Sequence, residues 1–480
     1  MENDLIKALA AALAPHLEQS KHDLPAGYTL TTNFMHGVNG IFGAAGIDRD
    51  IFSTRVQPTG LLSKLPAFGS NATHPLVGFF TGVTQGDTTN QDAPCDDPPS
   101  AGNLKSCKIG SAFGRLMLST DPIQVDRIGE IVNRGEMTDL RVVNDPVMQS
   151  DLAVPGLAGG AVSAAIRQEV LARFYALGAM FQERLAPMLW TGTTANNSVN
   201  GGYKEFNGFD QLITTGHVDV ESNVSCPSLD SLILNANYAS VNTNAASIFY
   251  WMLNMWRDLK HRASTMGMNP VQWALVMRAN LFRELTDYWP CVYASHRCDA
   301  TTNQLSNNTD AMMMRQMSDQ MYNGMYLILD GERVPVVIDD AIEEDTNVNN
   351  GNVPAGSFAS DVYFIPLTVT GGYRVTFMEY FNFNGPNGVA QALELGFATN
   401  EIMVSDGGRF LWTKSREKVC IKWEALTNLR LRLLTPFLAG RLQNVLYSPL
   451  IHFRDAFAAF PYHSNGGNQT ANNDPYYNVD

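Results

Sequence analysis

The sequence predicts an α+β fold with an extended arm, a long hairpin, a long helix and a region of short strands. Two patterns support this prediction. Residues 161–185 place apolar side chains at helical spacing, whereas residues 111–144 alternate apolar and polar side chains on both sides of a turn. At 480 residues, the chain exceeds the roughly 250–300 residues at which a single core stops growing, so two or more packed units are expected.

The composition predicts a surface with few charges, which is covered by Asn, Thr, Ser and Gly or is buried against neighbouring subunits. Charged residues form 17% of the chain, below the ~25% of ordinary globular domains, and subunit interfaces are depleted of charge. The net charge of −14 comes without a long basic run, which argues against a specific grip on nucleic acid, because such binding needs clustered Lys and Arg. No apolar run approaches the ~18 residues of a membrane span, so no membrane partner is expected.

Residues 1–65 are predicted to form a short helix followed by an extended arm. Leucines at helical spacing follow the N-cap candidate Asp4. Residues 20–65 then lack a sustained period and are dotted with Gly, Pro and Thr, which is typical of an extended segment. Residues 82–107 are polar and rich in turn-forming residues, so an exposed insertion loop is expected there.

The hairpin predicted at residues 111–144 turns near Asn133-Arg134-Gly135. A two-stranded ribbon is only marginally stable alone in water. We therefore expect this element to lie on a partner.

The clearest helix covers residues 161–185, and Pro187 is predicted to end it. A helix of this length spans roughly 37 Å at 1.5 Å per residue, which is long for a globular domain. The apolar side chains that recur at steps of three or four are Val162, Ile166, Val170, Phe174, Leu177, Phe181 and Leu185.

A second helix is predicted over residues 244–266, and short strands separated by loops are expected beyond it. A methionine-rich run that includes Met317 and Met321 is interpreted as core or subunit interface. The predicted strands are Gln272–Met277, Met325–Leu329, Val334–Ile338, Val362–Pro366 and Arg374–Met378.

The six cysteines include no CxxC pair, so their spacing indicates neither a zinc knuckle nor a redox pair. Cys291, His296 and Cys298 lie close together but lack a second half-site, and buried or free thiols are the favoured interpretation. Cys95 and Cys107 flank a loop and could pair in an oxidising environment.

The sequence shows no motif that would indicate an enzyme. A P-loop, a GxSxG elbow and an HExxH helix are all absent from it. The acidic run from Asp339 to Asp345 could bind a divalent metal or supply a general acid, but a solvated acidic turn after a strand is favoured. We therefore predict no catalytic residue, no metal site and no cofactor.

The order of these elements resembles that of tailed-bacteriophage major capsid proteins with the Hong Kong 97-like fold. The stretch FGRLMLSTDPIQVDRIGEIVNRGE is similar to the family's extended loop (E-loop), which precedes the long spine helix. The series VPVVIDD, DVYFIPL, GGRFLW and RLLTPFLAGRLQNV is similar to the C-terminal third, with Arg441 in the returning strand region. The helix exit, MLWTGTTANNSVNGGYKEFNGFDQLITTGH, matches the family's Gly-rich turn at Trp190, Gly192, Phe206, Gly208, Leu212 and Gly216.

The resemblance covers most of the chain, from about Asn33 to Pro449, and its motifs are not catalytic. It implies a peripheral (P) domain built on the spine helix and an axial (A) domain of mixed sheet and helices. The implied order is an N-terminal helix and arm (1–65), an insertion loop (66–108), the E-loop hairpin (109–150), the P-domain with the spine helix (151–240), the A-domain with part of the P-domain (241–412), the return to the P-domain (413–452) and a C-terminal tail (453–480).

The function that the resemblance implies is that of a major capsid protein. Such subunits self-assemble as hexamers and pentamers into an icosahedral head that encloses double-stranded DNA without sequence-specific binding. The implied partners are further copies of the chain, a portal protein, a scaffolding protein and decoration proteins. The implied location is the virion, after assembly in the host cytoplasm. One alternative is an encapsulin-like nanocompartment shell protein, although members of that family are shorter chains without such long insertions and arms. The other alternative is a decoration or minor virion protein.

Overall fold

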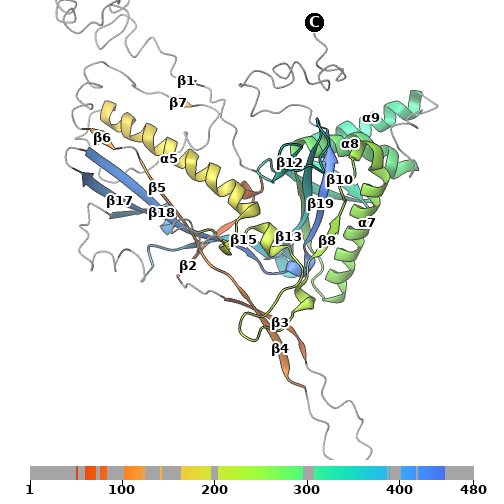
Figure 1. The fold of residues 1–480 in the computed structure, drawn as a ribbon, viewed down its shortest axis with the longest axis horizontal. Coiled ribbons are helices and arrows are strands. Elements are labelled where there is room, and N and C mark those ends of the chain that lie inside the picture. Colours follow the sequence, from red (N-terminus) through yellow and green to blue (C-terminus); the bar gives the residue numbers. More distant parts are fainter. Residues whose placement is uncertain are drawn as a thin grey trace, which may run out of the picture. The chain divides into compact units, whose positions relative to one another are not determined.

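The computed structural model in Figure 1 describes residues 50–51, 60–71, 76–83, 102–120, 122–124, 141–142, 164–195, 204–295, 308–385, 389, 402–417 and 420–448. The N-terminal helix, the turn at Asn133-Arg134-Gly135, Cys95, the His296–Cys298 pair and the tail lie outside these residues. Contacts divide the chain into two compact units, one of residues 1–57, 117–182 and 382–427 and the other of residues 58–116, 183–381 and 428–480. The predicted α+β class is confirmed.

The second unit is organised around a mixed sheet. Its strands follow the order β10 (Tyr326–Leu329), β11 (Glu332–Ile338), β9 (Gln272–Met277), β13 (Phe358–Val369), β19 (Gly440–Tyr447) and β8 (Leu232–Asn235), and β12 (Glu344–Thr346) and β14 (Tyr373–Arg374) pair with β13. The central strands β9 and β13 are buried over most of their length, as expected for strands covered on both faces. The predicted strand Gln272–Met277 matches β9 at both ends, and three of the other predicted strands fall on β10, β11 and β13. The predicted strand Arg374–Met378 is instead divided at Val375 between β14 and β15 (Thr376–Phe381).

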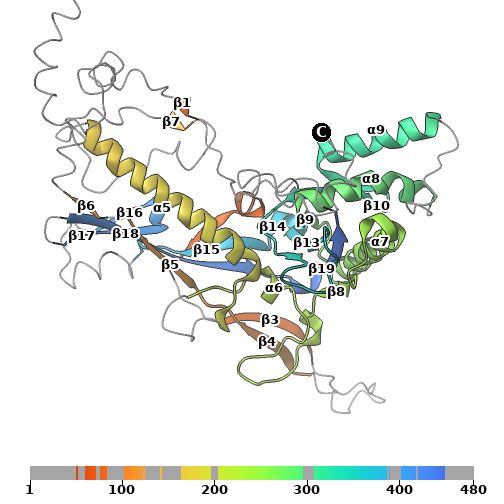
Figure 2. The same ribbon diagram turned by 45° about the horizontal axis from the view of Figure 1, so that its top comes forward.

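Three helices accompany this sheet: α7 (Val241–Thr265), α8 (Ala279–Ser295) and α9 (Asn308–Gly324). Figures 1 and 2 both show α7 running alongside the strands. The stripe predicted on α7 is buried at Ile248, Met252 and Leu259, which confirms that helix. The helix α8 was expected to be loop and strand, although its buried residues do recur at helical spacing. Met321 of α9 is buried in the core, as the methionine pattern predicts.

The second unit also contains strands of another sheet. β2 (Ala67–Ser70) pairs in parallel with β15 (Thr376–Phe381), which pairs antiparallel with residues 429–433 of β18 (Cys420–Leu433). Short 3-10 turns lie at Leu61–Ser63, Pro227–Leu229, Thr370–Gly372 and Pro436–Leu438 in this unit, and at Asp406–Gly408 in the first.

The first unit contains the hairpin of β17 (Phe410–Glu417) and the start of β18, extended by β16 (Ile402–Ser405). The described parts of the predicted 111–144 hairpin are β5 (Gly114–Ser119), β6 (Ile123–Gln124) and β7 (Arg141–Val142). β5 and β6 pair with β18, whereas β7 pairs in parallel with β1 (Asp50–Ile51). The described residues of the two arms therefore pair with other strands and not with each other.

The long helix is α5 (Ala164–Thr191). Its predicted apolar stripe is buried at Leu177 and Phe181, while Phe174 lies among the side chains that are not described. The prediction that Pro187 ends the helix was wrong, because the helix continues for one more turn. That turn carries Met188, Leu189 and Trp190, which are all buried. The free energy gained from packing them offsets the loss of the backbone hydrogen bond that proline cannot donate.

Candidate assembly surface

The strands β3 (Leu76–Val83) and β4 (Leu104–Gly110) form a separate hairpin that pairs with no other strand in the described part of the chain. Residues 104–107 were expected in a loop but belong to β4. Phe80, Val83 and Leu104 keep 64%, 54% and 75% of their surface exposed. A two-stranded ribbon is only marginally stable by itself in water. Apolar side chains exposed on such a ribbon are typical of a surface that a partner covers.

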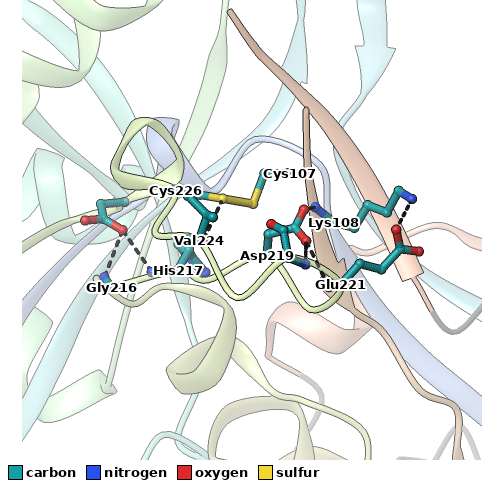
Figure 3. The surroundings of a disulfide bond; sticks show 10 residues. Cys107, Lys108, Gly216, His217, Asp219, Glu221, Val224 and Cys226 are labelled. Carbon is teal, nitrogen blue, oxygen red and sulfur yellow. Dashed lines mark hydrogen bonds and ion pairs between the residues drawn. A yellow bond between two sulfur atoms is a disulfide. The ribbon is translucent and has the colours of Figure 1, made fainter. Parts of the chain in front are cut away.

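The root of this hairpin is fastened to the loop of residues 216–226 by a disulfide between Cys107 and Cys226 (Figure 3). The N–H of Lys108 donates to the carboxylate of Asp219 at 2.8 Å, and the N–H of Val220 donates to the carbonyl of Lys108 at 2.9 Å. Cys107 therefore pairs with Cys226 rather than with Cys95. Spacing alone does not determine disulfide connectivity, and the two sulfurs meet because the loop lies along β4 (Figure 3).

Asp219 organises the loop from within. Its carboxylate also accepts hydrogen bonds from the N–H groups of Glu221 at 2.9 Å and Ser222 at 2.7 Å. These backbone donors favour the charged form and lower the pKa of Asp219 to about 2. The same loop exposes Val218, Val220 and Val224. We call β3, β4 and residues 216–226 the hairpin module.

The exit from α5 is held by two glycines that permit a close approach of backbones. The N–H of Gly208 donates to the carbonyl of Gly192 at 2.8 Å. A Cβ on Gly208 would lie 2.5 Å from the carbonyl oxygen of Trp190, and one on Gly192 would lie 2.5 Å from that of Met188. Phe206 beside this turn is fully buried. Gly192 and Gly208 therefore lie at a close approach of two backbone segments after α5, in the stretch where the resemblance implies a Gly-rich turn.

The segment after this exit is tied to the sheet by a partly buried ionic network. Arg441 of β19 contacts Asp361 with Nε at 2.6 Å and Asp210 of α6 (Phe209–Leu212) with Nη1 at 3.2 Å. The hydroxyl of Tyr363 donates to Asp210 at 2.5 Å. Burial raises the pKa of Asp210, while Arg441 lowers it. Each charged group of the network has a partner within it, so we interpret the network as a structural contact between α6 and the sheet.

The acidic run from Asp339 to Asp345 has structural partners as well. The carboxylate of Asp339 accepts hydrogen bonds from the N–H groups of Leu61 at 2.8 Å and Ala341 at 3.0 Å, and Glu344 pairs with Arg278 at 3.2 Å. Among the described residues, no group of three or more His, Cys, Asp or Glu side chains is placed to hold a metal ion. Within the same residues, no helix is long and apolar enough to cross a membrane.

Comparison with known proteins shows similarity to shell proteins at the level of structure. No family model and no curated protein sequence matches the chain. The solved structures similar to it include the capsid of cyanophage A-1(L), with 13% identity, a TM-score of 0.45 and coverage of 82% of this chain and 94% of that one. The capsid of Myoviridae phage XM1 has 10% identity and a TM-score of 0.44, covering 88% and 100%. The holo-SrpI encapsulin complex from Synechococcus elongatus PCC 7942 has 10% identity and a TM-score of 0.38, covering 84% and 94%.

Proposed function

We propose that this chain is a capsid shell subunit that self-assembles as hexamers and pentamers into the icosahedral head of a tailed phage, around double-stranded DNA. The observation that carries the proposal is the hairpin module. Its ribbon has no further strand partner in the described residues, and its side chains Phe80, Val83 and Leu104 face solvent. A neighbouring copy would remove this apolar surface from water, at about 25 cal/mol per Å² buried.

The charge of the chain suits a container for DNA. The chain has a net charge of −14, and an acidic inner wall would repel phosphate, so that DNA could enter and leave without tight nonspecific contacts. The groups that resemble a reactive cluster, Asp339 and Glu344, are engaged in structural contacts. A structural and non-enzymatic role without a cofactor is therefore part of the proposal.

The domain arrangement follows the resemblance. We assign residues 109–150 to the E-loop, residues 151–240 to a P-domain with α5 as its spine, residues 241–412 to the A-domain with part of the P-domain, and residues 413–452 to the return. The long α5 and its glycine exit support this assignment. A portal, a scaffolding protein and decoration proteins are the proposed partners. Assembly would take place in the host cytoplasm, and the mature protein would reside in the virion.

Self-assembly of the purified chain tests the proposal directly. We expect negative-stain images and light scattering to show closed shells or capsomers. A variant with Phe80, Val83 and Leu104 all changed to Ser should keep its thermal unfolding but lose particles, since the changes remove only exposed apolar surface. Val348→Ser, at an almost fully exposed side chain in another loop, is the matched control and should assemble. A wild-type chain that stays monomeric under all assembly conditions would refute the proposal.

The contents of particles from the native source separate a phage head from an encapsulin-like compartment. Nuclease-protected double-stranded DNA of genome length is expected for a head. A packaged enzyme in place of DNA would instead support the nanocompartment.

A further inference from the structure

A pocket lies at the root of the hairpin module, where β3 and β4 meet the α6 segment and the end of β18. Phe79 and Ile109 of the hairpin form one apolar side, and Leu212 and Leu433 contribute further apolar lining. Two basic side chains, His217 and Arg432, also line it. All of these residues belong to the second unit.

His217 contributes a polar atom without a partner. The residue is only 8% exposed, and its Nε2 has no hydrogen-bond partner in the described part of the chain. Burial lowers the pKa of His217, although Asp230 raises it, so the neutral imidazole is favoured. A neutral imidazole protonated at Nε2 is a donor, and a buried donor without an acceptor is costly.

Arg432 contributes a charge that is only partly compensated. Its Nε lies 2.9 Å from Oε2 of Glu379, and the Nε of Arg430 lies 2.7 Å from that same oxygen. One carboxylate is thus shared by two guanidinium groups. The remaining described contact of Arg432 is a long one, from Nη1 to Oγ of Ser111 at 3.4 Å. A guanidinium presents five donors in a planar fork, so Arg432 retains capacity for a second anion.

We propose that this root pocket accepts an acidic side chain, Asp or Glu, from a second copy of the chain, with its carboxylate on Arg432 and His217 and its methylene groups against the apolar lining. The proposal rests on the shell function proposed above and identifies one contact between subunits. Charge complementarity favours a second copy as the occupant. The residues that line the pocket include the basic side chains of Arg432 and His217 and no Asp or Glu, while the chain as a whole has 47 acidic against 33 basic residues. The pocket is also continuous with the hairpin module, since Phe79 and Ile109 belong to both.

Photo-crosslinking in assembled particles tests the occupant. Gln211 lines the pocket and is exposed, so Gln211→benzoylphenylalanine places a reactive group at the pocket without removing a core side chain. Particles are assembled from a mixture of unlabelled and ¹⁵N-labelled chains, irradiated and digested. We expect crosslinked peptides of mixed isotope composition that join this position to a segment containing Asp or Glu. Crosslinks within one copy only, to another protein or to no peptide would overturn the proposal.

A charge series at Arg432 tests the chemistry. Arg432→Gln should raise the subunit concentration needed for assembly about tenfold, and Arg432→Lys, which keeps the charge but loses the fork, should raise it less. Arg257→Gln is the matched control, because Arg257 makes an exposed pair with Asp330 in the same unit. Thermal unfolding of each full-length variant reports whether it folds. Equal assembly of Arg432→Gln and Arg257→Gln would overturn the proposal, whereas a wild-type chain without particles would refute the shell function itself.

Discussion

The contribution of the Cys107–Cys226 disulfide to the free energy of unfolding can be calculated from the length of the loop that it closes. The two cysteines are separated by 119 residues, so the bond closes a long loop in the unfolded chain. The chain-entropy relation assigns a loop of this length about 5 kcal/mol of stabilisation at 25 °C. Cys107 is fully buried and Cys226 nearly so. Replacement of both by Ala, in place of Ser, therefore introduces no buried hydroxyl. The lost constraint on the unfolded chain should then dominate the change in the free energy of unfolding.

Calorimetry of the full chain in the presence and absence of reductant measures this contribution. Reduction should lower the unfolding temperature of the wild type by roughly 5 °C, since the unfolding entropy grows with chain length, and the Cys107→Ala/Cys226→Ala variant should unfold at the lower temperature in both buffers. Cys420→Ala is the control, because Cys420 is a free thiol, and it should respond to reductant as the wild type does. An unchanged wild-type transition, with complete reduction verified by mass, would refute the reasoning. A Cys95–Cys107 peptide in a non-reducing digest would refute the pairing.

Four further outcomes are expected. Gly208→Ala should destabilise the chain by about 3 kcal/mol in urea unfolding, because the new Cβ would lie 2.5 Å from the backbone oxygen of Trp190; an unchanged midpoint would contradict the close approach. Arg441→Met should cost about 3 kcal/mol in the same assay, since it leaves the partly buried carboxylates of Asp210 and Asp361 without their cation. Burial raises the pKa of Glu284 to about 7, so the stability gained from its neutral carboxyl is fully present below pH 4.5 and is lost as the pH rises to 7. The free energy of unfolding of Glu284→Gln should match that of the wild type at pH 4 and exceed it by about 3 kcal/mol at pH 8. Boiled, reduced particles should run as a single monomer band on a denaturing gel. In the capsid family that the chain resembles, covalent chain-mail requires an E-loop lysine, and residues 109–203 contain no lysine. A ladder of covalent multimers would contradict this prediction.

Local patterns in the sequence were sufficient for some of the regular elements, α5, α7 and β9 among them, but not for α8. The stripes of α5 and α7 repeat with the period of a helix, and β9 is a short apolar run, so their residues specify the element without reference to the rest of the chain. The glycine-rich helix exit at positions 192 and 208 was implied by the resemblance and not by a local pattern. The resemblance to capsid proteins depended on the order of these elements.

The tertiary structure alone decided which distant residues meet. Cys107 and Cys226 lie 119 residues apart, and the separation between Arg432 and its contact Ser111 is 321 residues; no periodicity encodes either contact. Pro187 stays within α5 because Met188, Leu189 and Trp190 beyond it are buried, a packing energy that local propensity does not contain. Helix and strand preferences act over a few residues, whereas disulfides, ion pairs and pockets depend on how strands far apart in the chain align.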